Sequence, residues 1–221
     1  MLDVLTPCNV VRNGVSLHSR SGGQGPPLLL LHGDPQSMAM RHLPAPAPAE
    51  HCHLVLIDLR GCGDSGRPAA DAEHRAHSKR EMAWDAMAVM QTHRFERFAA
   101  LAHDRGVQVT HRLATEQPQA VSCLGLYVAP TPATCEHTSE AFARAHWHRF
   151  FFIRPPRLPD ALPAERMVAH CFDVLPLWRE RAAQLSCQTL PCGHYIAEEA
   201  PEALLAQAIP FFNDTDPRST P

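Results

Sequence analysis

The chain has 221 residues, of which 45% are hydrophobic and 19% charged, and its formal net charge is −3. This length suits one domain with a sizeable core, or one domain with a small excursion. The charge gives no indication of nucleic-acid or membrane binding, and no stretch reaches the ~18 consecutive apolar residues of a spanning helix. The first residues carry an aspartate where a signal peptide has Lys or Arg, so we expect a cytoplasmic location.

Eight cysteines are scattered along the chain, and none of them forms a Cys-x-x-Cys pair. His51-Cys52-His53 is one group with metal-ligand chemistry, but neighbouring side chains in a strand point to opposite faces and do not converge on one ion. Cys187, Cys192 and His194 form the other. We therefore expect reduced, mostly buried thiols, with no metal and no cofactor.

The first part of the chain predicts a hairpin followed by two buried strands. Asn13-Gly14 separates residues 9–12 from residues 15–20 and is a strong short-range hairpin signal. The apolar runs 28–31 and 54–59 predict buried strands.

Between those two strands, residues 44–48 carry a proline at every second position. A proline in a helix interior costs ~3 kcal/mol. We therefore expect a connection that is short, kinked or extended in place of a crossover helix.

Helices and strands then alternate. Residues 78–93 have helical periodicity, a strand ends near residue 103, and a helix-like segment and another strand follow at 107–116 and 121–128. Continuous apolar strands that alternate with helices predict an α/β fold with a mostly parallel sheet covered on both faces. The polar tail from residue 213 to residue 221 predicts disorder.

Residues 98–106 read Phe-Ala-Ala-Leu-Ala-His-Asp-Arg-Gly, an apolar run that ends in small-x-Asp-x-Gly. This is the layout of a nucleophile elbow, a sharp strand-to-helix turn that exposes one reactive side chain between small residues. Asp104 holds the reactive position, which excludes a serine hydrolase at this turn. A carboxylate nucleophile displaces a leaving group from carbon and leaves an ester on the enzyme. The alternative is that Asp104 only caps the following helix.

Several motifs occur in a fixed order around this elbow. They are His32-Gly-x-Pro35-Gln36, Asp58-Leu-Arg-Gly-x-Gly-Asp-Ser-Gly66, His103-Asp-Arg-Gly106, Trp147-His148 and Gly193-His194-Tyr195. With them the chain resembles the haloacetate (fluoroacetate) dehalogenases, a branch of the α/β-hydrolase superfamily. The resemblance covers residues 8–155 and 172–212. It implies an α/β-hydrolase fold with an N-terminal hairpin and a helical cap.

The resemblance assigns roles to individual residues. Asp104 is expected as the nucleophile and His194 as the general base that activates water. Backbone N–H groups near Asp34 and Arg105 are expected to face the oxyanion. Arg105 is expected to hold the substrate carboxylate through charge-assisted hydrogen bonds, although it could instead be a surface ion-pair residue.

Two further roles concern the halide and the carboxylate. The resemblance implies that His148, next to Trp147, helps to bind the departing halide, although a core histidine is a comparable reading among the nearby phenylalanines. Gln108 stands where the family has a second arginine for the substrate carboxylate. A neutral amide still donates hydrogen bonds, but the charge-assisted contribution is lost.

Other departures concern the catalytic acid and the loop after His32. The segment Leu126-Tyr127-Val128 has no carboxylate where the family carries its acid, so His194 lacks the expected partner that orients it. Asp173 is a weak replacement that suits a helix cap better. Asp34 replaces the phenylalanine that the family has after His-Gly.

The chain is also short for this fold. Residues 133–193 would have to hold a cap, a further strand, its helix and the last strand, while one strand-helix-strand unit alone takes ~30 residues. We therefore expect a truncated cap and one strand fewer than in the full fold. The predicted division is 1–132 and 171–213 for the core, 133–170 for the cap remnant, and 214–221 for the tail.

The predicted reaction is hydrolysis of the carbon–halogen bond of a small 2-haloacid through an aspartyl ester, with weakened or altered activity. A catalytically defective relative, either with a binding or structural role or as a degraded copy, is the alternative from another class. An epoxide hydrolase-like enzyme stays open, but its cap tyrosines have no counterpart. A haloalkane dehalogenase would carry a tryptophan where Arg105 stands. The expected partner is a small halogenated acid, without nucleic acid or membrane, and a homodimer is left open.

Overall fold

The structure is a computed structural model that describes residues 2–41, 46–71, 73, 75–127, 190, 192 and 195–214. All of these residues fall in one compact unit of the chain. The predicted cap remnant, 133–170, and the predicted helix from Asp173 lie outside the described residues. None of the helices described is both long enough and apolar enough to cross a membrane.

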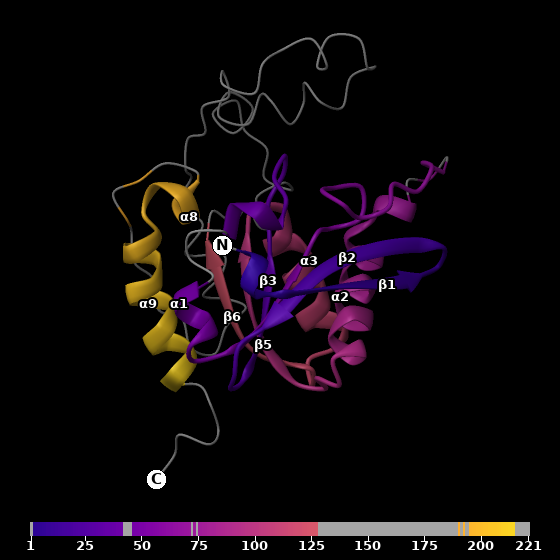
Figure 1. Ribbon diagram of the computed structural model, residues 1–221. Coiled ribbons are helices and arrows are strands. Elements are labelled where there is room, and N and C mark those ends of the chain that lie inside the picture. Colours follow the sequence, from indigo (N-terminus) through magenta and orange to yellow (C-terminus); the bar gives the residue numbers. More distant parts are fainter. Residues whose placement is uncertain are drawn as a thin grey trace. The chain divides into compact units, whose positions relative to one another are not determined.

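Six strands of the described residues form one sheet in the order β1-β2-β4-β3-β5-β6 (Figure 1). Their bounds are Thr6–Arg12 for β1, Val15–Gly22 for β2, Pro27–Leu31 for β3, His53–Ile57 for β4, Phe98–His103 for β5 and Val121–Tyr127 for β6. Strands β4, β3, β5 and β6 are parallel to one another, whereas β2 is antiparallel to β1 and β4. The predicted fold class, a mostly parallel α/β sheet with an N-terminal hairpin, is confirmed.

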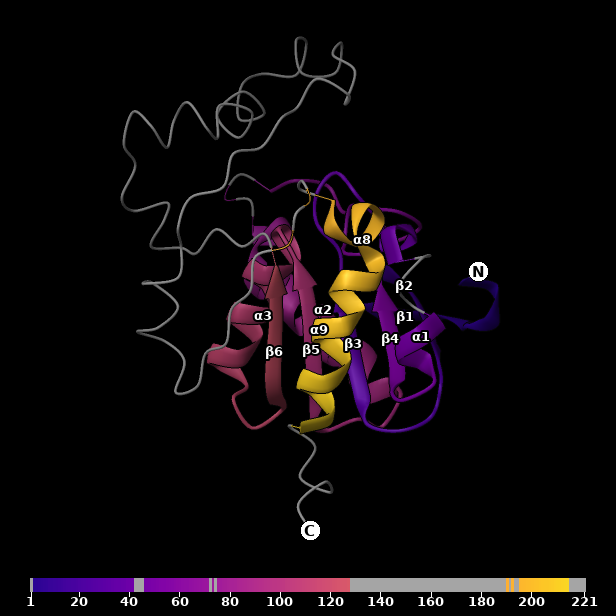
Figure 2. The same cartoon turned by 90° about the vertical axis from the view of Figure 1, so that its left-hand side faces the viewer.

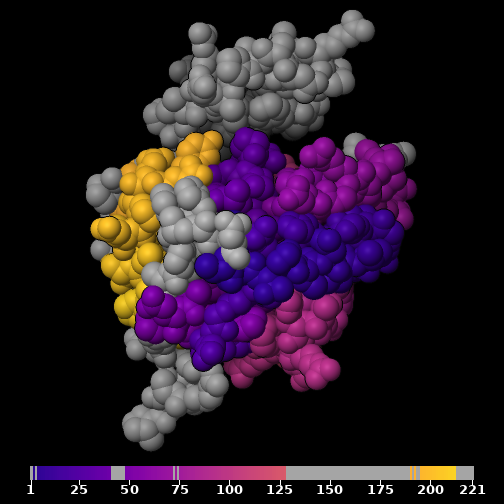
Figure 3. Space-filling model, viewed as in Figure 1, coloured from indigo at the N-terminus to yellow at the C-terminus, as the bar shows by residue number. Residues whose placement is uncertain are grey.

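The hairpin turn forms as its two central residues predict. Asn13 and Gly14 have φ values of 49° and 76°, and Arg12 pairs with Val15 across the turn. Positive φ at both central residues is the mark of the type I′ turn, whose twist matches that of the flanking strands. Figure 3 shows this hairpin lying across one face of the molecule.

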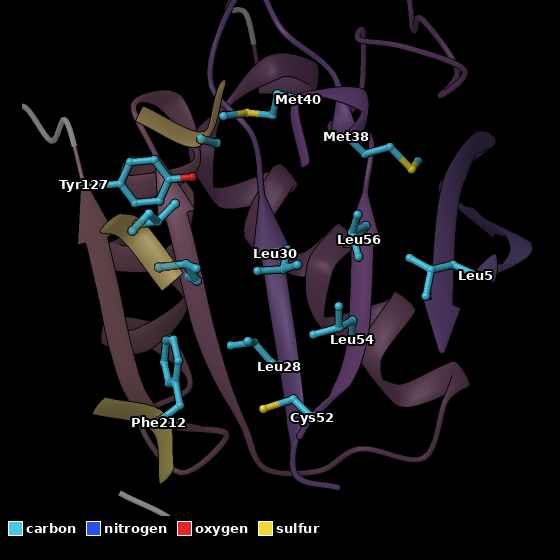
Figure 4. Packing of buried hydrophobic residues seen from close by; sticks show 13 residues of the cluster. Leu5, Leu28, Leu30, Met38, Met40, Cys52, Leu54, Leu56, Tyr127 and Phe212 are labelled. Carbon is cyan, nitrogen blue, oxygen red and sulfur yellow. The ribbon is translucent and has the colours of Figure 1, made fainter. Parts of the chain in front are cut away.

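Helices cover both faces of the sheet (Figures 1 and 2). The helices α2 (Lys79–Thr92) and α3 (Arg105–Glu116) lie on one face, and α9 (Pro201–Asp214) and α1 (Pro46–Ala49) on the other. In β3 the side chains of Leu28 and Leu30 join a cluster with Phe212 of α9 (Figure 4). Because side chains alternate along a strand, Leu29 and Leu31 point to the opposite face, and both are fully buried. Burial of each such side chain contributes ~1.5–3 kcal/mol.

The proline-rich connection before β4 differs from the expectation. It contains the one-turn helix α1, although we expected no helix there. The first N–H groups of a helix have no intrahelical partner, so the missing N–H groups of Pro46 and Pro48 remove no hydrogen bond from a single turn. The carbonyl of Pro48 then accepts from the N–H of His51 at 3.0 Å and from that of Cys52 at 2.8 Å.

The C-terminal segment also differs from the expectation. Asn213 and Asp214, which we placed in the polar tail, are the last residues of α9. This helix was not predicted, because Pro201 and Pro210 are breaker signals at its start and in its interior. Apolar residues at helical spacing, Leu204, Ala208 and Phe212, pack it against the sheet.

A buried charge network ties the hairpin to α2. Arg60, just after β4, donates from Nε and Nη2 to both carboxylate oxygens of Asp85, at 2.5 and 2.6 Å. Arg12 of β1 donates from Nη1 to the same carboxylate at 3.0 Å and to Glu81 at 2.7 Å. The side chains of Arg60 and Asp85 are each only 3% exposed. The planar fork of the guanidinium suits this bidentate contact.

Candidate active site

The carboxyl ends of the parallel strands meet at one edge of the sheet, where sites of open α/β folds are built. Strand β3 runs into His32, Gly33 and Asp34, and β5 runs into Asp104. The structure therefore brings the predicted nucleophile and the predicted oxyanion residues to one place.

Asp104 occupies a strained turn between β5 and α3. Its φ of 44° and ψ of −108° lie outside the regions that non-glycine residues ordinarily adopt. Strain of this kind costs about 1–3 kcal/mol and persists only where the surroundings hold it. Asp104 stands at the N-cap position of α3, but its side chain makes no capping hydrogen bond to the helix, so the cap of the alternative reading is one of backbone alone.

Two glycines allow the backbone to close around this turn. A Cβ at Gly33 would lie 2.9 Å from the Cβ of Asp104 and 2.7 Å from Nδ1 of His103. A Cβ at Gly106 would lie 2.8 Å from the carbonyl oxygen of His32. Separations below 3.0 Å force neighbouring atoms to move, so the approach of the two loops requires glycine at both positions.

The backbone N–H of Asp34 donates to Oδ2 of Asp104 at 3.2 Å. Asp104 is 8% exposed, so this donor faces a carboxylate that is largely withdrawn from water. A backbone N–H at this position can stabilise negative charge on an oxygen attached to the Asp104 carboxyl carbon. This is the geometry expected of an oxyanion donor.

Arg105 forms an ion pair with Asp34, a partner that was not predicted from the sequence. Its Nη2 lies 2.9 Å from Oδ2 of Asp34, and the two side chains are 33% and 42% exposed. The alternative reading of Arg105 as an ion-pair residue therefore describes its state in this structure. The change from phenylalanine to Asp34 was the available signal, because it places a carboxylate beside an elbow that carries an arginine.

The loop after β4 carries a cysteine, Cys62, whose titration responds to the same pair. The pKa of Cys62 is raised, first by burial, while the charge of Arg105 lowers it and the charge of Asp34 raises it. The charges of Asp34 and Arg105 thus act in opposite directions on this thiol.

The carboxylate of Asp58 organises the two loops that border the site. It accepts from the N–H of Met38 at 2.7 Å and from the N–H of Asp64 at 3.0 Å. A Cβ at Gly63, where φ is 50°, would lie 2.1 Å from Asp58 Oδ2. The Asp-Leu-Arg-Gly-x-Gly-Asp-Ser-Gly motif is thus a scaffold in this structure.

His32 is also held as part of the scaffold. Its Nε2 accepts from the N–H of Leu59 at 3.0 Å, and its Nδ1 lies 2.6 Å from the carbonyl oxygen of Gly33. Because Nε2 is an acceptor, the hydrogen-bond network assigns the proton to Nδ1. The ring is thereby fixed in its neutral form between the two loops.

Tyr127 ends β6, at the position where the family carries its acid. Its ring belongs to the buried cluster on the α9 face (Figure 4) and stacks on His103 with centroids 5.0 Å apart. Its carbonyl oxygen lies 3.4 Å from the N–H of Asp104. The position therefore supports the elbow through its backbone and supplies no carboxylate.

His194 lies outside the described residues, and so do Trp147, His148 and Asp173. Tyr195, directly after His194, has a raised pKa because of burial, followed by the negative charges of Glu198 and Asp104. The charge of Asp104 thus contributes to the raised pKa of Tyr195. Gln108 is described, half-buried, and three residues after Arg105, so the two residues are neighbours on the surface of α3.

Comparisons with known proteins agree with this architecture. The family model of the alpha/beta hydrolase fold matches residues 26–173. A solved structure of a candidate α/β hydrolase from Nostoc sp PCC 7120 is 31% identical, with a TM-score of 0.86, covering 96% of this chain and 99% of that one. A variant of a candidate epoxide hydrolase from Pseudomonas aeruginosa is 25% identical, with a TM-score of 0.82, covering 96% of each chain.

Among curated relatives, fluoroacetate dehalogenase of Burkholderia sp is 40% identical over 147 residues, which are 66% of this chain and 48% of the relative. Soluble epoxide hydrolase of Corynebacterium sp. (strain C12) is 34% identical over 112 residues, 51% of this chain and 37% of the relative. The chain thus spans about half or less of the length of these relatives. The family match and the sheet topology together show that the chain belongs to the α/β-hydrolase fold family.

Proposed function

We propose that the chain hydrolyses the carbon–halogen bond of a small 2-haloacid through an ester on Asp104. The observation that carries this proposal is the Asp104 carboxylate at a strained elbow. It makes no capping hydrogen bond to α3, and its Oδ2 accepts from the N–H of Asp34. A serine at this position would favour ester hydrolysis, whereas a carboxylate favours displacement at carbon.

In the first step a carboxylate oxygen of Asp104 attacks the carbon that bears the halogen. The new carbon–oxygen bond forms as the carbon–halogen bond breaks, and the halide leaves with the bonding electron pair. Trp147 and His148 are the residues proposed to stabilise the halide, and Arg105 with Gln108 are proposed to hold the substrate carboxylate.

In the second step His194 takes a proton from water, and the hydroxide attacks the carboxyl carbon of the ester. The oxyanion that forms is proposed to accept from the backbone N–H groups of Asp34 and Arg105. The bond between that carbon and the alkoxy oxygen then breaks. The alkoxy oxygen takes the proton from His194, which releases a 2-hydroxy acid, and the carboxyl group of Asp104 then loses its remaining proton to water and is a carboxylate again.

The alternative is a defective relative that stops at the ester or before it. Tyr127 at the end of β6 favours this reading, because His194 then lacks the carboxylate that would stabilise its imidazolium. The loss of such an acid lowers turnover by about 10⁴-fold in a well-studied triad. A release of halide equivalent to the protein, without turnover, distinguishes this alternative from an active enzyme.

The experiment is incubation of the protein with chloroacetate and fluoroacetate, with measurement of free halide and of the mass of the peptide that contains Asp104. We expect halide release that Asp104→Asn abolishes, and an ester mass on Asp104 that accumulates in His194→Ala. Glu50→Gln, at the opposite edge of the sheet, is the matched control. Absence of both halide and ester would overturn the proposal for these substrates.

An epoxide-opening enzyme is the second candidate within the fold. The Arg105–Asp34 pair favours it, because a neutral substrate does not need a vacant guanidinium. Hydrolysis of a small epoxide to its diol, lost in Asp104→Asn and without halide release from haloacids, would select this candidate.

A further inference from the structure

We propose that Asp34 is a specificity-determining residue whose carboxylate competes with the carboxylate of the substrate for Arg105. This inference rests on the proposed function, since it assumes that Arg105 is the anchor of an acid substrate. It concerns the charge of the substrate that the site accepts.

The contact itself is the first support. Oδ2 of Asp34 lies 2.9 Å from Nη2 of Arg105, the distance of a charge-assisted hydrogen bond. A carboxylate of the chain thus occupies part of the fork that would bind a substrate carboxylate. With both side chains a third or more exposed, the pair can open in favour of a competing anion.

The charge balance is the second support. Asp34 and Asp104 are joined through a backbone N–H at 3.2 Å, and Arg105 is the cation in contact with Asp34. These three groups together carry one negative charge before substrate arrives, and a haloacetate adds a second. Without the Asp34 carboxylate the same three positions would be neutral before binding. A like charge nearby disfavours binding of an anion, while it leaves a neutral molecule of the same shape almost unaffected.

The proposed effect on specificity belongs to the side chain of Asp34, whereas its backbone contacts Asp104. The oxyanion donor is its N–H, which every residue except proline supplies. The substitution Asp34→Asn therefore keeps the donor and the side-chain shape, and it removes only the charge.

The test compares two ligands, glycolate and glycolamide, which differ in charge and need no catalytic step. We expect Asp34→Asn to tighten glycolate binding about tenfold and to change glycolamide binding less than twofold, because the electrostatic interaction at this separation is of that order at a half-exposed site. Ligand-observed NMR follows weak binding of both compounds. Glu50→Gln removes an equal charge at the opposite edge of the sheet and should leave both affinities unchanged.

A second background isolates Arg105. In Arg105→Gln the effect of Asp34→Asn on the preference for glycolate should fall well below tenfold, since the group for which the two carboxylates compete is gone and only the repulsion between like charges remains. If the tenfold change persists without Arg105, or if the two ligands respond equally, the inference is wrong.

Failure of this inference can be distinguished from failure of the proposed reaction. A tenfold change in glycolate affinity without any halide release from chloroacetate would support the inference and overturn the proposed reaction. Halide release with no change in the preference for chloroacetate over chloroacetamide in Asp34→Asn would do the reverse.

Discussion

Two arginine–aspartate pairs in this molecule have opposite surroundings. Arg60 and Asp85 are each 3% exposed and form two short hydrogen bonds, whereas Arg105 and Asp34 are 33% and 42% exposed and form one contact. A buried charge has no water to replace a lost partner, but a half-exposed one does. The first pair is therefore part of the fold, and the second is available for exchange with a ligand.

The largest expected difference is in stability. Asp85→Asn removes the carboxylate that Arg60 contacts twice and leaves the buried guanidinium only Glu81, 3.8 Å away, so we expect the free energy of unfolding to fall by about 3 kcal/mol. Asp34→Asn should change it by less than about 1 kcal/mol. Chemical denaturation with equal slopes for the three proteins provides the measurement. Equal losses for both variants would refute the contrast.

A double substitution tests whether the loss of stability in Asp85→Asn comes from leaving a buried charge unpaired. Arg60→Met combined with Asp85→Leu removes both buried charges, so it should lose less stability than Asp85→Asn alone. Arg12 still has Glu81 at 2.7 Å in that variant, so no unpaired arginine remains in the network.

Salt should separate the two pairs next. At about 1 M ionic strength the Debye length is ~3 Å, so exposed charges are screened and buried ones far less. We expect the tenfold effect of Asp34→Asn on glycolate affinity to shrink to about threefold or less. The stability difference between Asp85→Asn and the parent chain should remain. If the effect of Asp34→Asn did not change with salt, dissolved ions would not screen this pair, and the contrast with the buried pair would be wrong.

Much of the fold could be predicted from the sequence, for reasons that differ from element to element. The Asn13-Gly14 turn, the buried strands and the helix after Asp104 are set by local signals, and the structure has each of them. The helices α1 and α9 were not predicted because both contain prolines, and prolines in a sequence are normally taken as signs that a helix is interrupted. Their existence depends on packing against the sheet, which is a property of distant residues.

The site divides in the same way. Asp104 could be predicted because the elbow is a local pattern of small residues around one side chain. The contact between Asp34 and Arg105 joins residues 71 positions apart in numbering, so only the fold reveals it. The missing acid at Tyr127 was visible in the sequence, but the stacking of its ring on His103 was not.

A smaller effect concerns the pKa of Tyr195. The negative charge of Asp104 helps to raise it, because a nearby anion disfavours the phenolate. Asp104→Asn should therefore lower the pKa of Tyr195, as measured by ultraviolet absorbance during alkaline titration. Tyr195→Phe identifies the signal against that of Tyr127. An unchanged titration would mean that the segment after His194 does not face the nucleophile in solution.

The smallest effect concerns acid stability. The hydrogen bond from Arg12 lowers the pKa of Glu81, so the folded state binds the Glu81 proton less readily than the unfolded state. The stabilisation is present above the unfolded pKa of about 4.3 and is lost as pH falls through the lowered folded value. Glu81→Gln should flatten the stability profile in this acid range. An unchanged stability profile in Glu81→Gln would contradict this expectation.

The division of labour within residue 34 has an evolutionary consequence. Its backbone serves Asp104 and its side chain serves Arg105, so the two contributions can be inherited separately. Under the mechanism proposed above, a single codon change there shifts the preference of the site between charged and neutral substrates, while the backbone donor to Asp104 stays in place. Under that mechanism, position 34 is a place where substitution alters substrate preference and leaves the reaction unchanged.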